Sequence, residues 1–273
     1  MDNIGIISYA TGSGVFLVTS LVLMTGRRNR PHKNALMLAS LVSALWMGLT
    51  AATANSDGPA LLSYLLEPLR DLFLLAFVVR VLSAAYQDPA ESSQYFRRTI
   101  GILSSYTLLL TTLVLYRGIS RSTATVFGGI DLLLAGFLVM AVAGLVLIEQ
   151  LIRNARPESR RSVKYLCIGL GAIFAYDFYL YSHALLFGSV DPLLWSARGF
   201  INAIVVPVIG VAAVRDPQWS LDIFVSRRVV FHTAALLGSA LYLLAIGVGG
   251  YLSNSMAEPG VRLARSSSCL VPY

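Results

Sequence analysis

The chain has 273 residues, of which 56% are hydrophobic and 13% are charged. Soluble domains carry about 25% charged residues, so this composition excludes a soluble globular enzyme. The formal net charge of +7 can indicate nucleic-acid binding. The basic residues instead lie in short loops between apolar runs, without an aromatic-interleaved patch, so we expect no nucleic-acid partner.

Long apolar runs follow one another along most of the chain. A bilayer core about 30 Å thick needs roughly 20 apolar residues in a helix. Eight runs meet or approach this length: 4–25, 34–54, 60–82, 99–115, 127–148, 165–187, 193–214 and 233–252. They do not alternate in polarity as barrel strands do, and helices satisfy their own backbone hydrogen bonds inside hydrocarbon. The sequence therefore predicts an all-α fold, a polytopic transmembrane helical bundle of about eight spans.

The connections between the runs are short, which predicts one membrane domain over residues 1–252. Residues 253–273 have no apolar run and no periodicity, so we expect a short tail, either disordered or the product of a truncation. No basic residue precedes the first run, so we interpret it as a retained helix rather than a cleaved signal peptide.

Basic residues gather in the loops after the first, third, fifth and seventh runs. These loops hold 14 of the 21 Lys and Arg residues, whereas the opposite side holds four. Positively charged loops stay in the cytoplasm, so the pattern predicts an N-terminus outside and an eighth run that also ends outside.

Cysteine and histidine are sparse. Cys167 lies inside the sixth run and Cys269 near the end of the tail, so a disulfide between them is not expected. No Cys–His spacing is typical of a zinc or redox site, and the sequence predicts neither a metal nor a cofactor.

Polar side chains inside the runs are the main candidates for function. Ionisable groups at membrane depth cost at least about 2.5–3.5 kcal/mol each, so they usually face the bundle interior and pair. The candidate intramembrane cluster is Glu67, Arg70, Asp71, Asp131, Asp177, His183, Arg198 and Asn202. The first three share one face of a helix. Most members fall in the predicted outer half of the membrane.

Two interpretations of this cluster remain open. Interhelical ion pairs that fix the packing are the favoured one. The other is a polar cavity, open to the outside, that detects a ligand, a proton or a lipid headgroup. An intramembrane aspartyl protease is a weaker third reading: Tyr176-Asp177 matches half of that motif, but the order relative to Asp131 is reversed and the glycine spacing differs.

The segment after the seventh run has the most distinctive local sequence in the chain. Asp216 and Pro217 end the preceding helix, and aromatic and basic residues follow. It predicts a juxtamembrane connector on the membrane surface, comprising Asp216, Pro217, Trp219, Asp222, Phe224, Arg227 and Arg228.

The stretch 198–233, which includes this connector, resembles the membrane sensor region of PrsK-type histidine kinases of the PEP-CTERM/exosortase system of Gram-negative bacteria. The resemblance covers roughly residues 1–252. It implies an inner-membrane sensory input domain, a homodimer, and a response regulator reached through a kinase region. The chain has no histidine in a phospho-acceptor context and no ATP-binding glycine boxes, so we expect no kinase activity from it alone.

Kinases of this type continue with a further span and the catalytic domains, so the resemblance leads us to expect a truncated or frameshifted chain. The alternatives are a small-solute transporter or scaffold, in which the intramembrane charges line a path, and an intramembrane enzyme acting through Asp131 and Asp177.

Overall fold

The computed structural model describes residues 3–25, 31–53, 61–83, 89–120, 126–127, 130–154 and 160–215. The described part is all-α apart from one two-residue strand pair. Its helices are α1 (Asn3–Thr25), α2 (Pro31–Ala52), α3 (Leu61–Ser83), α4 (Pro89–Ser120), α5 (Leu132–Arg153), α6 (Arg160–Phe187) and α7 (Pro192–Arg215). The predicted eighth span, the connector and the tail lie outside the described residues.

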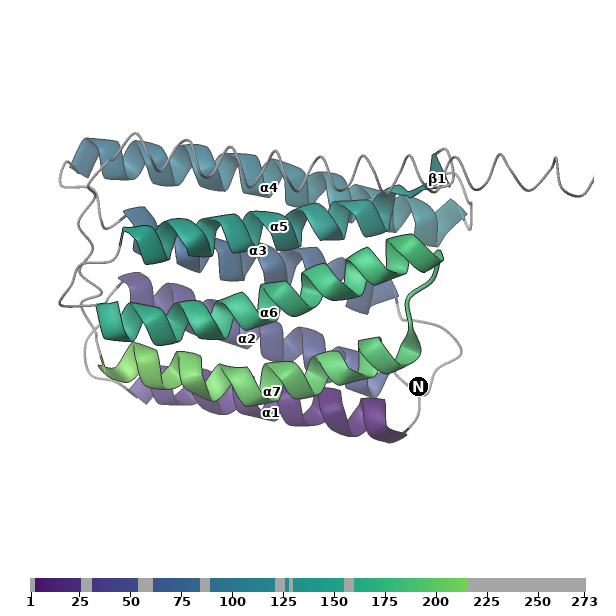
Figure 1. The fold of residues 1–273 in the computed structure, drawn as a ribbon, viewed down its shortest axis with the longest axis horizontal. Helices are drawn as coiled ribbons and strands as arrows, with labels where there is room; N and C mark the ends of the chain where they lie inside the picture. The colour runs from purple at the N-terminus through teal and green to yellow at the C-terminus, as the bar shows by residue number, and fades with distance from the viewer. Residues whose placement is uncertain are drawn as a thin grey trace, which may run out of the picture.

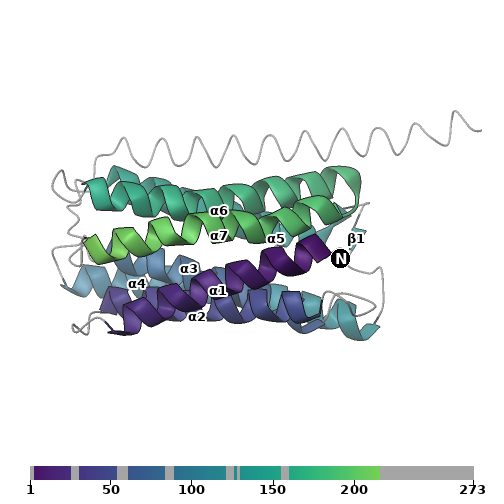
Figure 2. The same cartoon turned by 90° about the horizontal axis from the view of Figure 1, so that it is seen from below.

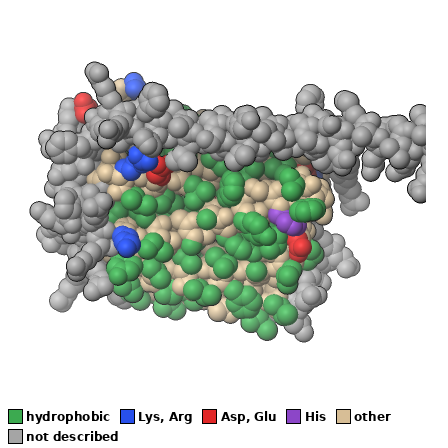
Figure 3. All heavy atoms as spheres, in the orientation of Figure 1, with side chains coloured by type: hydrophobic (Ala, Val, Ile, Leu, Met, Phe, Trp, Pro, Cys, Tyr) green, Lys and Arg blue, Asp and Glu red, His purple; other side chains and the backbone are tan. Residues whose placement is uncertain are grey.

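Six of these seven helices are long and apolar enough to cross a membrane. The exception, α3, has 23 residues but carries four charged side chains. The chain thus fits a multi-pass membrane protein. Apolar side chains also cover the middle of the face seen in Figure 3, while the charged ones lie near its edges. Large hydrophobic residues point outward with more than two thirds of their surface exposed, as at Met24, Ile102 and Ile204. Such faces suit contact with lipid.

The helices lie side by side along the long axis of the bundle (Figures 1 and 2). Helices α1, α2, α3, α5, α6 and α7 pack in that order, and α7 returns to pack against α1, which closes a ring. Helix α4 lies outside this ring against α3 and α5. The odd-numbered helices begin at the end that carries the chain N-terminus, which we call the N-terminal end.

The ring closes where α1 and α7 approach closely. A Cβ atom at Gly199 would lie 2.6 Å from the backbone carbon of Ser8, so only glycine fits there without a shift. Two hydrogen bonds cross the same seam: the Ser8 hydroxyl donates to the Ser196 carbonyl at 2.5 Å, and Tyr9 donates to the Trp195 carbonyl at 2.9 Å. The most distant parts of the described sequence are therefore fixed together.

Helix α4 differs most from the prediction. The run 99–115 is the shortest, yet α4 has 32 residues and is the longest helix described. Arg97 and Arg98, predicted in a loop, lie within it. An apolar run marks the part of a helix in hydrocarbon, and the helix continues beyond it where polar side chains meet water. From Arg98 to Arg117 the helix rises about 28 Å, close to the thickness of the bilayer core.

A short antiparallel strand pair precedes α5. Strand β1 (Val126–Phe127) pairs with β2 (Ile130–Asp131), with Phe127 opposite Ile130. The predicted span 127–148 therefore begins five residues too early, because α5 begins at Leu132. Asp131 is the N-cap of α5, and its Oδ1 accepts a hydrogen bond from the Leu133 N–H at 2.9 Å.

Candidate functional site

Six of the eight predicted cluster residues meet inside the ring. Glu67, Arg70 and Asp71 come from α3, Asp177 from α6, and Arg198 and Asn202 from α7; each is at most 3% exposed. The α3 residues share a face because positions three and four apart lie one above another on a helix. We call these six residues the ionic network.

Arg198 joins three helices. Its Nε donates to Asp177 Oδ1 at 2.6 Å, which ties α7 to α6. Its Nη1 donates to Glu67 Oε1, which ties α7 to α3. Both contacts are ion pairs, so the prediction of interhelical ion pairing is confirmed for this residue.

Arg70 forms the second centre of the ionic network. Its Nη1 donates to Asp71 Oδ1 at 3.2 Å and to Asp177 Oδ2 at 3.1 Å. Its Nη2 donates to Asn202 Oδ1 at 3.2 Å, and the Asn202 amide donates to the Arg198 carbonyl at 2.7 Å. Asp177 thus lies between two guanidinium groups. This arrangement is unlike an aspartyl dyad, in which two carboxylates share a proton.

Aromatic rings enclose the two arginines. Trp46 on α2 lies 4.8 Å from the guanidinium carbon of Arg70 and 4.7 Å from that of Arg198. Tyr181 and Trp195 lie 5.6 and 5.4 Å from Arg198. Such rings attract a desolvated cation. None of these rings belongs to the cluster predicted from the sequence. Only Tyr181 could be associated with the cluster from the sequence, because it follows Asp177 by four residues on the same helix.

The ionic network leaves polar atoms without partners. Within the described part of the chain, Glu67 Oε2, Arg70 Nε and Arg198 Nη2 are buried and form no hydrogen bond. An unsatisfied buried group costs about 1–3 kcal/mol, and more when it is charged. These three atoms are therefore the least satisfied part of the ionic network.

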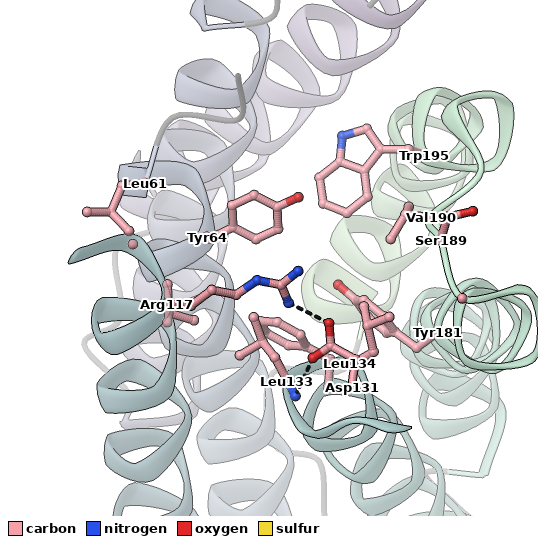
Figure 4. A pocket seen from close by; sticks show the side chains of 14 residues that line it. Leu61, Tyr64, Arg117, Asp131, Leu133, Leu134, Tyr181, Ser189, Val190 and Trp195 are labelled. Atoms are coloured by element: carbon pink, nitrogen blue, oxygen red, sulfur yellow. Dashed lines mark hydrogen bonds and ion pairs between the residues drawn. The ribbon is translucent and has the colours of Figure 1, made fainter. Parts of the chain in front are cut away.

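A pocket of about 390 Å³ opens at the N-terminal end, between α3, α4, α5, α6 and the start of α7. Figure 4 shows the Arg117 side chain reaching toward Asp131, with Tyr181 and Trp195 among the other side chains that line the pocket. Most of its lining is apolar or aromatic, with Tyr64 among the rings. Its volume lies near the lower end of the range of about 300–1,000 Å³ that small-molecule sites occupy.

Asp131 belongs to this pocket and not to the ionic network. Its Oδ2 accepts a hydrogen bond from Arg117 Nη1 at 2.5 Å, in a partly exposed ion pair. His183 is also separate: it is half-buried on α6, with its ring 4.4 Å from that of Phe187. The structure therefore divides the predicted cluster into a buried network, a pocket residue and a histidine that joins neither.

Tyr181 connects the pocket to the ionic network. Its ring lines the pocket and stacks on Phe137 at a centroid distance of 5.1 Å. Its hydroxyl donates to Glu67 Oε1 and accepts from Arg198 Nη1 at 3.3 Å. A molecule in the pocket would therefore touch a side chain bonded to the buried charges.

The residues of the predicted connector lie outside the described part of the chain. Among the described residues, no group of three or more His, Cys, Asp or Glu side chains is arranged to hold a metal ion. Comparison with family models, with curated proteins and with solved structures gives no match to this chain.

Proposed function

We propose that the chain is a membrane-embedded sensory input domain that binds a small molecule in the pocket at the N-terminal end. The observation that carries this proposal is Tyr181, which is at once a wall of the pocket and a hydrogen-bond partner of Glu67 and Arg198. A sensor needs this kind of shared residue, because a ligand shifts an equilibrium only through contacts that differ between two states.

The proposed signal is a change in the position of α7 relative to α3 and α6. A ligand that moves the Tyr181 ring would loosen its bonds to Glu67 and Arg198. Arg198 would then exchange partners, since its Nη2 is already buried without one within the described chain. Small helix shifts of about 1–2 Å are a common form of such switching.

The distribution of basic residues supports an orientation for this sensor. The loops predicted to be cytoplasmic join the helices at the end opposite the pocket. The pocket would then face the outside, where it could sample molecules that do not enter the cell.

The resemblance of residues 198–233 to PrsK-type kinases supports a place in two-component signalling. In this proposal the domain lies in the bacterial inner membrane, acts as a homodimer, and reports through a kinase region to a response regulator of the PEP-CTERM system. In this proposal the chain only senses the signal, and none of its residues is catalytic.

The test is made in the source organism, with Tyr181→Phe introduced into the gene. Tyr179→Phe is the matched control, because Tyr179 lies on the same helix but is half exposed outside the ionic network. Transcripts of PEP-CTERM protein genes are measured together with the amount of the chain in membranes. We expect Tyr181→Phe to change transcript levels at unchanged protein abundance, and Tyr179→Phe to behave as wild type.

Deletion of the gene provides the decisive outcome. Unchanged transcripts in the deletion strain would refute a signalling role. A liposome flux assay tests the transporter alternative: solute uptake that Glu67→Gln abolishes would support transport in place of sensing.

A further inference from the structure

The ionic network contains one more acid than base. Its carboxyl groups belong to Glu67, Asp71 and Asp177, and its guanidinium groups belong to Arg70 and Arg198. With all five groups ionised the formal charge is −1, and each of these side chains is at most 4% exposed. A buried charge without a partner is so costly that the group usually becomes neutral instead. The network therefore needs either a further positive charge or a bound proton.

The helices around the network bring no such charge in the described part of the chain. The three carboxyl groups form ion pairs only with Arg70 and Arg198. Helix α1 contributes Tyr9 and α2 contributes Trp46, whose rings lie 5.8 Å apart, and α6 adds Tyr181. A tyrosine hydroxyl is neutral at physiological pH. The other charged side chains of α3 to α6, and one histidine, lie toward the helix ends: Arg80, Glu91, Arg97, Arg98, Arg117, Asp131, Glu149, Arg153, Lys164 and His183.

Asp71 is the least stabilised of the three carboxylates. Asp177 accepts from both guanidinium groups, with one bond on each oxygen, at 2.6 and 3.1 Å. Glu67 accepts from a guanidinium group and from a tyrosine hydroxyl. Among the described residues Asp71 accepts one side-chain bond, of 3.2 Å, from the Arg70 nitrogen that also bonds Asp177. Because hydrogen bonds to the ionised form favour ionisation, Asp71 is the carboxylate that most readily takes a proton.

We propose that the ionic network binds one exchangeable proton, carried by Asp71. A neutral Asp71 leaves Arg70 bonded to Asp177 on α6 and to Asn202 on α7, at 3.1 and 3.2 Å. An ionised Asp71 draws Arg70 toward its own helix and weakens both of these bonds between helices. The proton is thus a second input to the same helix contacts. Its site is separate from the pocket, so the proposal does not depend on a pocket ligand.

The pocket provides a short connection for exchange of this proton. Tyr181 lines the pocket, and its hydroxyl donates to Glu67. Glu67 precedes Asp71 by four residues on α3, which is about 6 Å along the helix. Tyr181 and Glu67 therefore connect Asp71 to the part of the bundle that opens at its N-terminal end.

The test is infrared spectroscopy of the purified full chain. A protonated carboxyl group absorbs apart from carboxylates, and exposed acids are ionised at about pH 7. At this pH we expect a band equal to about one protonated carboxyl group per chain. The band should shift when the protein is made with aspartate whose side-chain carboxyl carries a heavy carbon isotope. It should decrease as the pH is raised to about 9, the range in which buried carboxyl groups titrate.

Variants test the charge balance. Asp71→Asn should abolish the band. Glu67→Gln should abolish it too, because two carboxyl groups then face two guanidinium groups and no proton is needed. Asp131→Asn is the matched control: Asp131 also pairs with an arginine, but its side chain is 17% exposed, and the band should remain. If a variant misfolds, the isotope label in the wild type still decides whether an aspartate carries the proton.

The melting temperature gives a second readout. The folded wild type holds one more proton than the unfolded chain, whose carboxyl groups are ionised at neutral pH. Its stability should therefore fall as the pH rises, and this fall should be smaller in Asp71→Asn.

Four results would overturn the proposal. Absence of the band in the wild type would show that all five groups are ionised, and stabilisation by sodium but not by potassium would then identify a sodium ion as the balancing charge. A band that does not shift with labelled aspartate would place the proton on a glutamate. A band that survives Asp71→Asn in a folded variant would place it on another aspartate. A band that is undiminished at about pH 9 would show a proton that does not exchange.

Discussion

Replacing Arg198 by Met is expected to destabilise the bundle strongly. The Arg198 side chain is fully buried and pairs with Glu67 and Asp177. In membrane proteins each lost interhelical hydrogen bond costs about 0.6 kcal/mol, so the three side-chain bonds donated by Arg198 account for roughly 2 kcal/mol. Asp177 keeps its ion pair with Arg70, but Glu67 is left without a basic partner among the described residues. This unpaired buried carboxylate raises the expected loss to about 3–5 kcal/mol, the usual cost of breaking a buried ion pair from one side.

The assay is heating in detergent followed by size-exclusion chromatography. Because unfolding of membrane proteins is often irreversible, the readout is an apparent melting temperature. A loss of about 3–5 kcal/mol corresponds to a decrease of roughly 6–20 °C for a chain of this size. Arg117→Met is the matched control: Arg117 also pairs with an aspartate, but its side chain is 46% exposed. Exposed pairs contribute about 0–1 kcal/mol, so its decrease should stay below about 4 °C.

The double variant Glu67→Gln/Arg198→Met tests the physical cause. If the loss in Arg198→Met comes from stranded negative charge, neutralising Glu67 should restore part of the melting temperature, and the two changes should not be additive. The reasoning would be refuted if Arg198→Met were no less stable than Arg117→Met. That result would mean that the ionic network does not hold α3, α6 and α7 together.

Three further predictions test the fold and its orientation. Gly199→Ala should lower the apparent melting temperature, because its Cβ would lie 2.6 Å from the Ser8 backbone. Gly171→Ala is the control and should be neutral, because its Cβ would meet an atom only at 3.9 Å. Equal effects of the two substitutions would contradict the close approach of α1 and α7. Asp131→Ala should cost about 1 kcal/mol in the same assay through loss of the α5 N-cap, whereas Asp131→Asn should keep most of it. Ser189→Cys, in a background without native cysteines, should react with a membrane-impermeant maleimide on intact cells; labelling only after lysis would reverse the proposed orientation.

The apolar runs predicted the helices well and their ends poorly. Hydrophobicity reports which residues lie in hydrocarbon, and the first three runs lie within a few residues of α1, α2 and α3. It does not report where a helix ends in water. This is why α4 extends from Pro89 to Ser120 although the apolar run covers only 99–115. It is also why the predicted start of the fifth span, at residue 127, falls on the strand pair that precedes α5.

The cost of placing charge in a membrane made the network residues identifiable before their partners were known. The sequence predicts that these residues pair inside the bundle, because ionisable and polar groups at membrane depth cost free energy unless they find partners. They are Glu67, Arg70, Asp71, Asp177, Arg198 and Asn202. The same criterion also selected Asp131 and His183, which lie elsewhere. Position along a helix gives depth in the membrane but not the direction in which the side chain points.

By itself, the sequence determined that the chain is helical, that most of its helices can cross a membrane, and that a few buried charges must find partners. Each of these follows from local chemistry: run length, backbone hydrogen bonding and the cost of burying an ion. Only the tertiary structure decided that α7 returns to α1, that Arg198 pairs with two carboxylates on different helices, and that Tyr181 stands between them and a pocket. Helix packing depends on the surfaces of pairs of helices far apart in the chain, and no run of residues taken alone contains that information.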